Sequence, residues 1–190
     1  MGTPRIPAAV AALILALAVA AAGCGGGGGG GGGGGTQPPT APQPSITFTA
    51  GSATAPAVRL ARGPGSGSSV LELQVRADAL TGVYGLAFDL TFPGGLLRYD
   101  GFAEGGFLGS DGSGTSVQVA AVGSGRLVVG CTRLGSVGTV SGSGVVVTLR
   151  FTAVGAGAGG FSFSDATVLD ASAAEVGGVS WAGGTVSTTL

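Results

Sequence analysis

The fold is decided by residues 70–92, which read VLELQVRADALTGVYGLAFDLTF. Apolar residues occupy every second position over 70–78, and the same alternation returns over 83–92. Successive side chains of a β-strand point to opposite faces of a sheet, so this period predicts two strands, each with one buried and one exposed face. The residues expected to face the core are Leu71, Leu73, Val75 and Ala77 in the first strand and Tyr84, Leu86, Phe88, Leu90 and Phe92 in the second.

The alternation continues outward from this stretch, and Gly, Ser and Pro interrupt it about every ten residues. Further strands are expected over 46–49, 96–102, 116–122, 126–133, 145–154, 161–168 and 179–188, the last with an interruption at Gly183-Gly184. Phe161 and Phe163 share a phase that Val168 breaks, which predicts a bulge or a crossing between sheets near Ser164 and Asp165. About nine strands and no helical period predict an all-β fold, a two-sheet antiparallel sandwich.

The longest of these strands is expected over 145–154, and its length favours a central place in a sheet. Its inward residues are expected to be Val145, Val147, Leu149, Phe151 and Ala153.

The beginning of the chain has the features of an exported lipoprotein. Residues 1–7 carry one positive charge, and the apolar run 8–22 is shorter than the roughly 20 residues that a membrane-spanning helix needs. Residues 1–23 are therefore expected to be a signal peptide. The tail Ala21-Ala22-Gly23-Cys24 resembles a bacterial lipobox, which implies lipid anchoring of Cys24 to the cell envelope, at the outer membrane or cell surface. Ordinary cleavage after residue 22 is the alternative.

A low-complexity segment follows the cysteine. Residues 25–35 are all Gly, and residues 36–44 are rich in Pro, Thr and Gln, so neither part can bury a core. Residues 24–44 are therefore expected to be a lipidated Cys with a flexible tether. Residues 45–190 remain as one domain, large enough to be stable without a metal or a disulfide.

The composition excludes several classes of function. The chain has no His, its formal net charge is −1, and its Arg residues are scattered, which argues against nucleic-acid binding. The absence of His also removes most catalytic bases and zinc ligands. We therefore expect no enzyme and no cofactor. The carboxylates weighed as a glycosidase pair are Asp89, Asp100, Glu104, Asp111, Asp165, Asp170 and Glu175, and most of them lie in predicted turns.

Two other possible sites are interpreted as structural. Neither the sequence Asp111-Gly112-Ser113-Gly114 nor the pair Asp165 and Asp170 has the spacing of a calcium loop, so turn formation is favoured and no metal is expected. Cys131 alternates with apolar neighbours and is expected to point into the core.

The order of several segments resembles the cohesin family. Residues 71–77, followed by Gly82-Val83-Tyr84-Gly85-Leu86-Ala87-Phe88-Asp89-Leu90-Thr91-Phe92 and then Leu96-Leu97, resemble the second, third and fourth cohesin strands. Residues 125–130 resemble the sixth strand, 145–154 the seventh, and 164–170 with 184–186 the closing segment. The resemblance implies a jelly roll that does no chemistry and binds a calcium-loaded dockerin, with a link to polysaccharide degradation.

The resemblance also implies where a partner binds. The family's recognition sheet would contain residues 83–92, 116–122, 126–133 and 161–169. The outward residues of its two adjacent strands are Gly85, Ala87, Asp89 and Thr91 with Val128, Gly130 and Thr132. These residues are small, and Asp89 is the one fixed charge, which favours a protein partner, dockerin-like or other, that docks by shape.

Two alternatives remain open. One is a carbohydrate-binding module, in which Trp181 and Tyr84 would stack on a sugar ring, although their apolar phase favours the core. The other is a structural surface lipoprotein.

Overall fold

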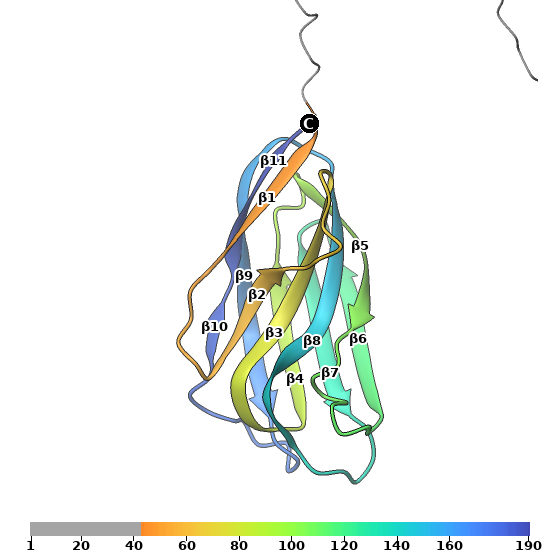
Figure 1. Ribbon diagram of the computed structural model, residues 1–190, viewed down its shortest axis with the longest axis vertical. Coiled ribbons are helices and arrows are strands. Elements are labelled where there is room, and N and C mark those ends of the chain that lie inside the picture. The colour runs from red at the N-terminus through yellow and green to blue at the C-terminus, as the bar shows by residue number, and fades with distance from the viewer. Residues whose placement is uncertain (1–42) are drawn as a thin grey trace, which may run out of the picture. The chain divides into compact units, whose positions relative to one another are not determined.

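Two packed β-sheets make up residues 43–190, the part of the chain that the computed structural model describes (Figure 1). The signal peptide, Cys24 and most of the tether, predicted over 1–44, lie outside the described residues. In spatial order the six-stranded sheet contains β1 (Ser45–Ala50), β11 (Gly184–Thr189), β9 (Gly157–Leu169), β4 (Gly85–Thr91), β7 (Arg126–Arg133) and β6 (Thr115–Val122). The five-stranded sheet contains β10 (Ser180–Ala182), β2 (Ala57–Arg62), β3 (Val70–Val83), β8 (Val140–Ala153) and β5 (Leu97–Glu104).

The all-β sandwich is confirmed, with eleven strands instead of about nine. Strand β2 was not expected, because only Val58 and Leu60 mark its buried face before the strand ends. The single strand expected over 179–188 is in fact two strands, β10 and β11, which belong to different sheets. Gly183 separates them and lies so close to β9 that a Cβ there would be 1.9 Å from the carbonyl oxygen of Phe161. All strand pairs are antiparallel except β10 with β2.

The alternation in β3 and β4 is confirmed. The four inward residues of β3 are fully buried, as are Leu86, Phe88 and Leu90 of β4, whereas Tyr84 is only partly buried. The bulge in β9 is also confirmed: Asp89 pairs with Ser164 and Ala87 with Thr167, so Asp165 and Ala166 of β9 lie opposite Phe88 alone and β9 has one extra residue there. Asp165 takes a φ of 47° there.

Strand β8 lies between β3 and β5, so its predicted place inside a sheet is confirmed. The expectation for Val145 is wrong. Val146 and Val147 are both buried while Val145 is half-buried, because the pairing with β3 shifts register between Val75 and Arg76. The inward phase predicted for the rest of β8 holds.

Aromatic side chains join the two sheets. Phe151 of β8 is fully buried, and its ring centroid lies 5.1 Å from that of Phe92 and 5.6 Å from that of Phe161. Phe92 directly follows β4 and Phe161 lies in β9, so both belong to the six-stranded sheet. Tyr99 of β5 completes this group at 5.8 Å from Phe151. Edge-to-face and tilted contacts of this kind add to the stability that burial alone provides.

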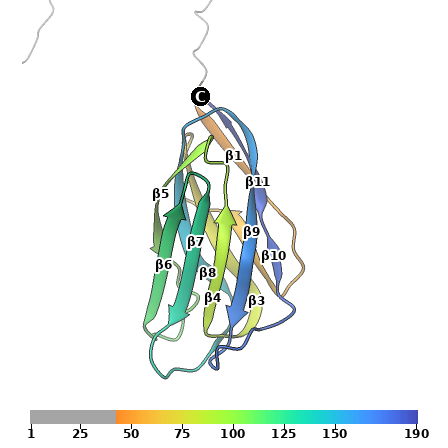
Figure 2. The same cartoon turned by 180° about the vertical axis from the view of Figure 1, so that it is seen from behind.

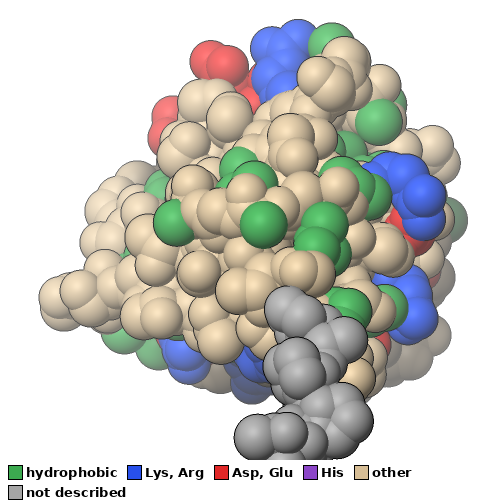
Figure 3. All heavy atoms as spheres, turned by 90° about the horizontal axis from the view of Figure 1, so that it is seen from above, with side chains coloured by type: hydrophobic (Ala, Val, Ile, Leu, Met, Phe, Trp, Pro, Cys, Tyr) green, Lys and Arg blue, Asp and Glu red, His purple; other side chains and the backbone are tan. Residues whose placement is uncertain are grey.

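The domain begins and ends in the same place, because Ser45 of β1 pairs with Thr189 of β11. Figure 3 looks onto this end and shows hydrophobic side chains in small groups, with Arg side chains towards the rim. Within residues 43–190 no helix is long and apolar enough to cross a membrane.

Candidate functional site: one face of the six-stranded sheet

The four strands expected to form a recognition sheet lie side by side. Their spatial order is β9, β4, β7 and β6, and Figure 2 shows them together on one side of the sandwich. Strands β4 and β7 pair over their full lengths, so Gly85 faces Thr132, Ala87 faces Gly130, and Asp89 faces Val128. We call the outward side of these four strands the β4–β7 face.

The seven predicted site residues are thus neighbours, but they are not equally accessible. Ala87, Gly130 and Thr132 are half-buried, and Thr91 and Val128 are exposed. Gly85 is buried. Asp89 is only 9% exposed, and its Oδ2 lies 3.1 Å from Nη1 of Arg126. Asp89, expected to be the one fixed charge that orients a partner, is therefore held in an ion pair with Arg126.

An open hollow of about 430 Å³ lies at one end of the β4–β7 face. Gly85, Ala87, Gly130 and Thr132 belong to its lining, whereas Asp89, Thr91 and Val128 lie outside it. The sequence analysis missed the other residues that line the hollow at the surface. They are Tyr84 of the β3–β4 connection, Ser116 and Gln118 of β6, and Leu169, Asp170, Ala171 and Ala173 at and after the end of β9.

Small residues keep the hollow open. A Cβ added at Gly130 would meet no other atom within 4 Å, so nothing fills the space above this residue. The outward positions of β6 continue the alternation and could have indicated Ser116 and Gln118 from the sequence. The loop after β9 carries no such signal, because its course depends on Asp170.

Asp170 holds the loop after β9 in a turn through hydrogen bonds to its side chain. Its Oδ1 accepts hydrogen bonds from the backbone N–H of Ser172 at 2.8 Å, from that of Ala174 at 3.0 Å and from the Ser172 hydroxyl at 2.7 Å. These bonds, the Ser172 hydroxyl first, lower the pKa of Asp170 below its ordinary value. Asp170 therefore forms a turn, as expected, and remains ionised near neutral pH.

Charge is unevenly divided between the two sheets. The charged residues of β9, β4, β7 and β6 are Asp165, Asp89, Arg126 and Arg133. The strands of the other sheet carry more, namely Arg59, Arg62, Glu72, Arg76, Asp78, Arg98, Asp100, Glu104 and Arg150. A partner that covers the β4–β7 face therefore has to desolvate fewer charged groups than one that covers the outward side of the other sheet.

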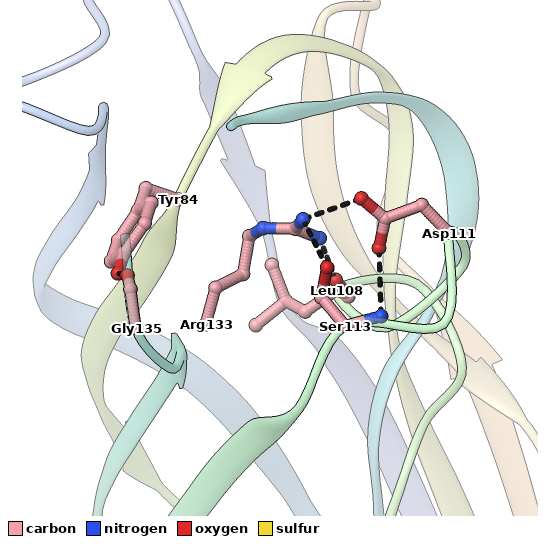
Figure 4. A network of polar contacts seen from close by, with 6 residues as sticks. All are labelled: Tyr84, Leu108, Asp111, Ser113, Arg133 and Gly135. Atoms are coloured by element: carbon pink, nitrogen blue, oxygen red, sulfur yellow. Dashed lines mark hydrogen bonds and ion pairs between the residues drawn. The ribbon is translucent and has the colours of Figure 1, made fainter. Parts of the chain in front are cut away.

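Arg133, at the end of β7, is the most completely buried charged residue of the domain, at 2% exposed. Its Nη2 donates to Oδ2 of Asp111 at 2.6 Å and to the Ser113 hydroxyl at 3.1 Å, and its Nη1 donates to the Leu108 carbonyl (Figure 4). The other oxygen of Asp111 accepts the Ser113 N–H at 3.1 Å. Asp111 therefore forms a turn and an ion pair, which fixes the β5–β6 loop to the strand end beside the hollow.

The remaining candidate side chains lie away from any common centre. Residues 43–190 contain no group of three or more His, Cys, Asp or Glu placed to hold a metal ion. Burial, with a smaller effect of Glu104, raises the pKa of the Cys131 thiol to about 12, so this residue is a core thiol as predicted. Trp181 is partly buried and packs against the core, with its ring centroid 5.2 Å from that of Phe163 and 5.7 Å from that of Phe88.

Comparison with solved structures identifies the fold. A type II cohesin of Acetivibrio cellulolyticus in a cohesin–X-dockerin complex superposes with a TM-score of 0.56 at 13% identity, over 66% of this chain and 93% of that one. A type II cohesin domain from the cellulosome of the same organism gives 0.52 at 14% identity, over 76% and 95%. The sixth cohesin of its scaffoldin B, in complex with a Cel5 dockerin, gives 0.50 at 20% identity, over 66% and 96%.

The domain therefore has the fold of the cohesin modules, as the order of its strand segments predicted. No protein-family model matches the sequence, and the search of curated proteins finds no significant match.

Proposed function

We propose that this domain is a non-catalytic binding module that captures a protein partner through the β4–β7 face. The observation that carries the proposal is a continuous four-stranded surface with few charges and an open hollow, whose lining includes the small residues Gly85, Ala87 and Gly130. Such a surface can be desolvated by a partner at low cost. Two similar structures are complexes with dockerins, so a dockerin-like module is the first partner to test. A role in polysaccharide degradation would follow from such a partner.

The proposal is tested with two Gly-to-Arg variants. Gly130 lies on the β4–β7 face and Gly67 in the β2–β3 connection of the other sheet, and a Cβ at either would meet nothing within 4 Å. Neither has a positive φ, so both variants should fold. Gly130→Arg should weaken partner binding at least tenfold, or by about 1.4 kcal/mol, because the added side chain would occupy part of the hollow and hold the partner away from the β4–β7 face. Gly67→Arg should bind like the wild type.

Binding affinity is measured by titrating each protein with purified dockerin modules, with and without a calcium chelator. The same titration is then done with any protein that the wild type captures from its source proteome. Equal affinity for wild type and Gly130→Arg, with unchanged melting of the variant, would remove the binding site from the β4–β7 face. Lost binding in Gly67→Arg would point to the other sheet.

Anchoring through Cys24 is part of the proposal. The apolar segment before Cys24 and the Gly-rich segment after it support a lipoprotein held at the bacterial cell envelope with its binding domain away from the membrane. Metabolic labelling with a fatty-acid analogue should mark the wild type and not Cys24→Ala. Equal labelling of the two proteins, or a wild type found wholly in the soluble fraction, would contradict it.

A further inference from the structure

The hollow on the β4–β7 face combines an apolar lining with a single charge. Among the residues that line it, Asp170 is the only one with an ionised side chain. Leu169, Ala171 and Ala173 flank this carboxylate, and Gly85 and Ala87 of β4 lie next to them. Ligand sites are commonly built in this way, with an apolar surface for contact area and one polar group for orientation.

The carboxylate of Asp170 retains one oxygen for a ligand. All three of its hydrogen bonds within the loop end on Oδ1, and Oδ2 has no partner among residues 43–190. The hydrogen bonds of the loop lower the pKa of Asp170 further below neutral pH, so the carboxylate is ionised there. A cation that enters the hollow would therefore meet a negative charge held in place by the loop. It could pair with Oδ2 without breaking the hydrogen bonds that the loop makes to Oδ1.

The surroundings of the hollow do not supply that cation. Arg133 is the nearest Arg in sequence to a lining residue, and its guanidinium is buried and bonded to Leu108 and Asp111. Neither Asp165 nor Glu175, which flank Asp170 in the chain, forms an ion pair within the described domain. The unpaired charges in this segment are therefore all negative.

We propose that the hollow takes a basic side chain, Arg or Lys, from the protein partner. The alkyl part of that side chain lies on the apolar lining, and its charged end pairs with Asp170. Long basic side chains suit such a site, because they bury a methylene stem while their charged end remains in a polar environment. This inference rests on the proposed function and adds the chemistry by which the partner is recognised.

The test uses a small probe and needs no partner. The 15N-labelled protein is titrated with butylguanidinium and, separately, with butylurea, which has a similar shape and no charge. Butylguanidinium should shift the amide signals of Gly85, Ala87 and Gly130 in a saturable way, with a Kd of about 1–10 mM. Butylurea should bind at least twofold more weakly, as expected for a half-exposed ion pair.

Two matched variants assign the charge effect. Asp170→Asn keeps the oxygen that holds the loop and removes the charge, so it should weaken butylguanidinium binding about two- to fivefold and leave butylurea unchanged. Asp165→Asn removes a charge outside the hollow and should have no effect.

The inference is overturned if no saturable shifts occur at these glycines and Ala87, or if both probes bind equally well, or if Asp170→Asn binds butylguanidinium like the wild type. Because no partner takes part, such a failure leaves the proposed protein-binding function standing. A failure of the Gly130→Arg test is likewise a separate result.

Discussion

Replacing Phe151 by Ala should lower the free energy of unfolding by about 3–5 kcal/mol. The ring is fully buried in β8 and contacts Phe92 and Phe161 on the opposite side of the core, so its removal opens a cavity between the sheets. The surrounding strands cannot close this cavity without breaking their hydrogen-bonded pairing, and the loss therefore exceeds the transfer free energy of the ring alone. Urea unfolding of wild type and variant measures the difference.

The control is the same substitution on the surface. Phe102 of β5 is 45% exposed, and Phe102→Ala should cost well under half as much as Phe151→Ala. If the two variants unfold at the same urea concentration with equal slopes, Phe151 does not join the sheets in the way described.

Replacing Arg133 by Ala should lower the free energy of unfolding by about 2–5 kcal/mol. The substitution leaves a cavity under the β5–β6 loop, removes the partner of the Leu108 carbonyl and frees Asp111 and Ser113. Arg133→Met fills most of the same volume, so it should cost less than Arg133→Ala. The difference between the two variants, measured by urea unfolding, separates packing from hydrogen bonding.

Acid provides an independent readout of the same network. The hydrogen bond from Arg133 is the largest of the effects that hold the pKa of Asp111 well below its ordinary value. A carboxylate with a lowered pKa in the folded state stabilises the fold above its unfolded pKa, and this contribution is lost as the pH falls below about 4. The wild type should therefore lose stability below this pH more steeply than Arg133→Met. Parallel acid profiles would show that Asp111 does not depend on Arg133.

The strands were predictable where one face of the sheet is buried and the other is exposed to solvent. In β3 and β4 polar and apolar residues alternate over many positions, because one side of each strand meets the core and the other meets water. The sequence marks an interruption at Gly183-Gly184, but it could not show that β10 and β11 belong to different sheets, because this depends on contacts such as the close approach of Gly183 to β9. The shift at Val145 has a similar origin in the pairing of β8 with β3.

The candidate site was predictable only in part. The alternation and the cohesin resemblance indicated Ala87 and Gly130, which indeed face each other across β4 and β7. The Arg133 side chain had a signal that was overlooked: it follows Leu127, Val129 and Cys131 in the inward phase of β7. Its partners on the β5–β6 loop, and the loop beside the hollow, depend on contacts between distant segments that no local pattern records.

The pairing of β1 with β11 bears on how the domain carries mechanical load. Strand β1 is an edge strand, joined along its length to β11 from Ser45–Thr189 to Ala50–Gly184. A pull along the axis of β1, applied ahead of Ser45 and opposed by a partner held on the β4–β7 face, would load the β1–β11 pair lengthwise. The hydrogen bonds between the two strands would then share the tension and yield together instead of opening one after another. A pull in that direction thus loads the outermost strand of the sheet in the way in which that strand is hardest to detach.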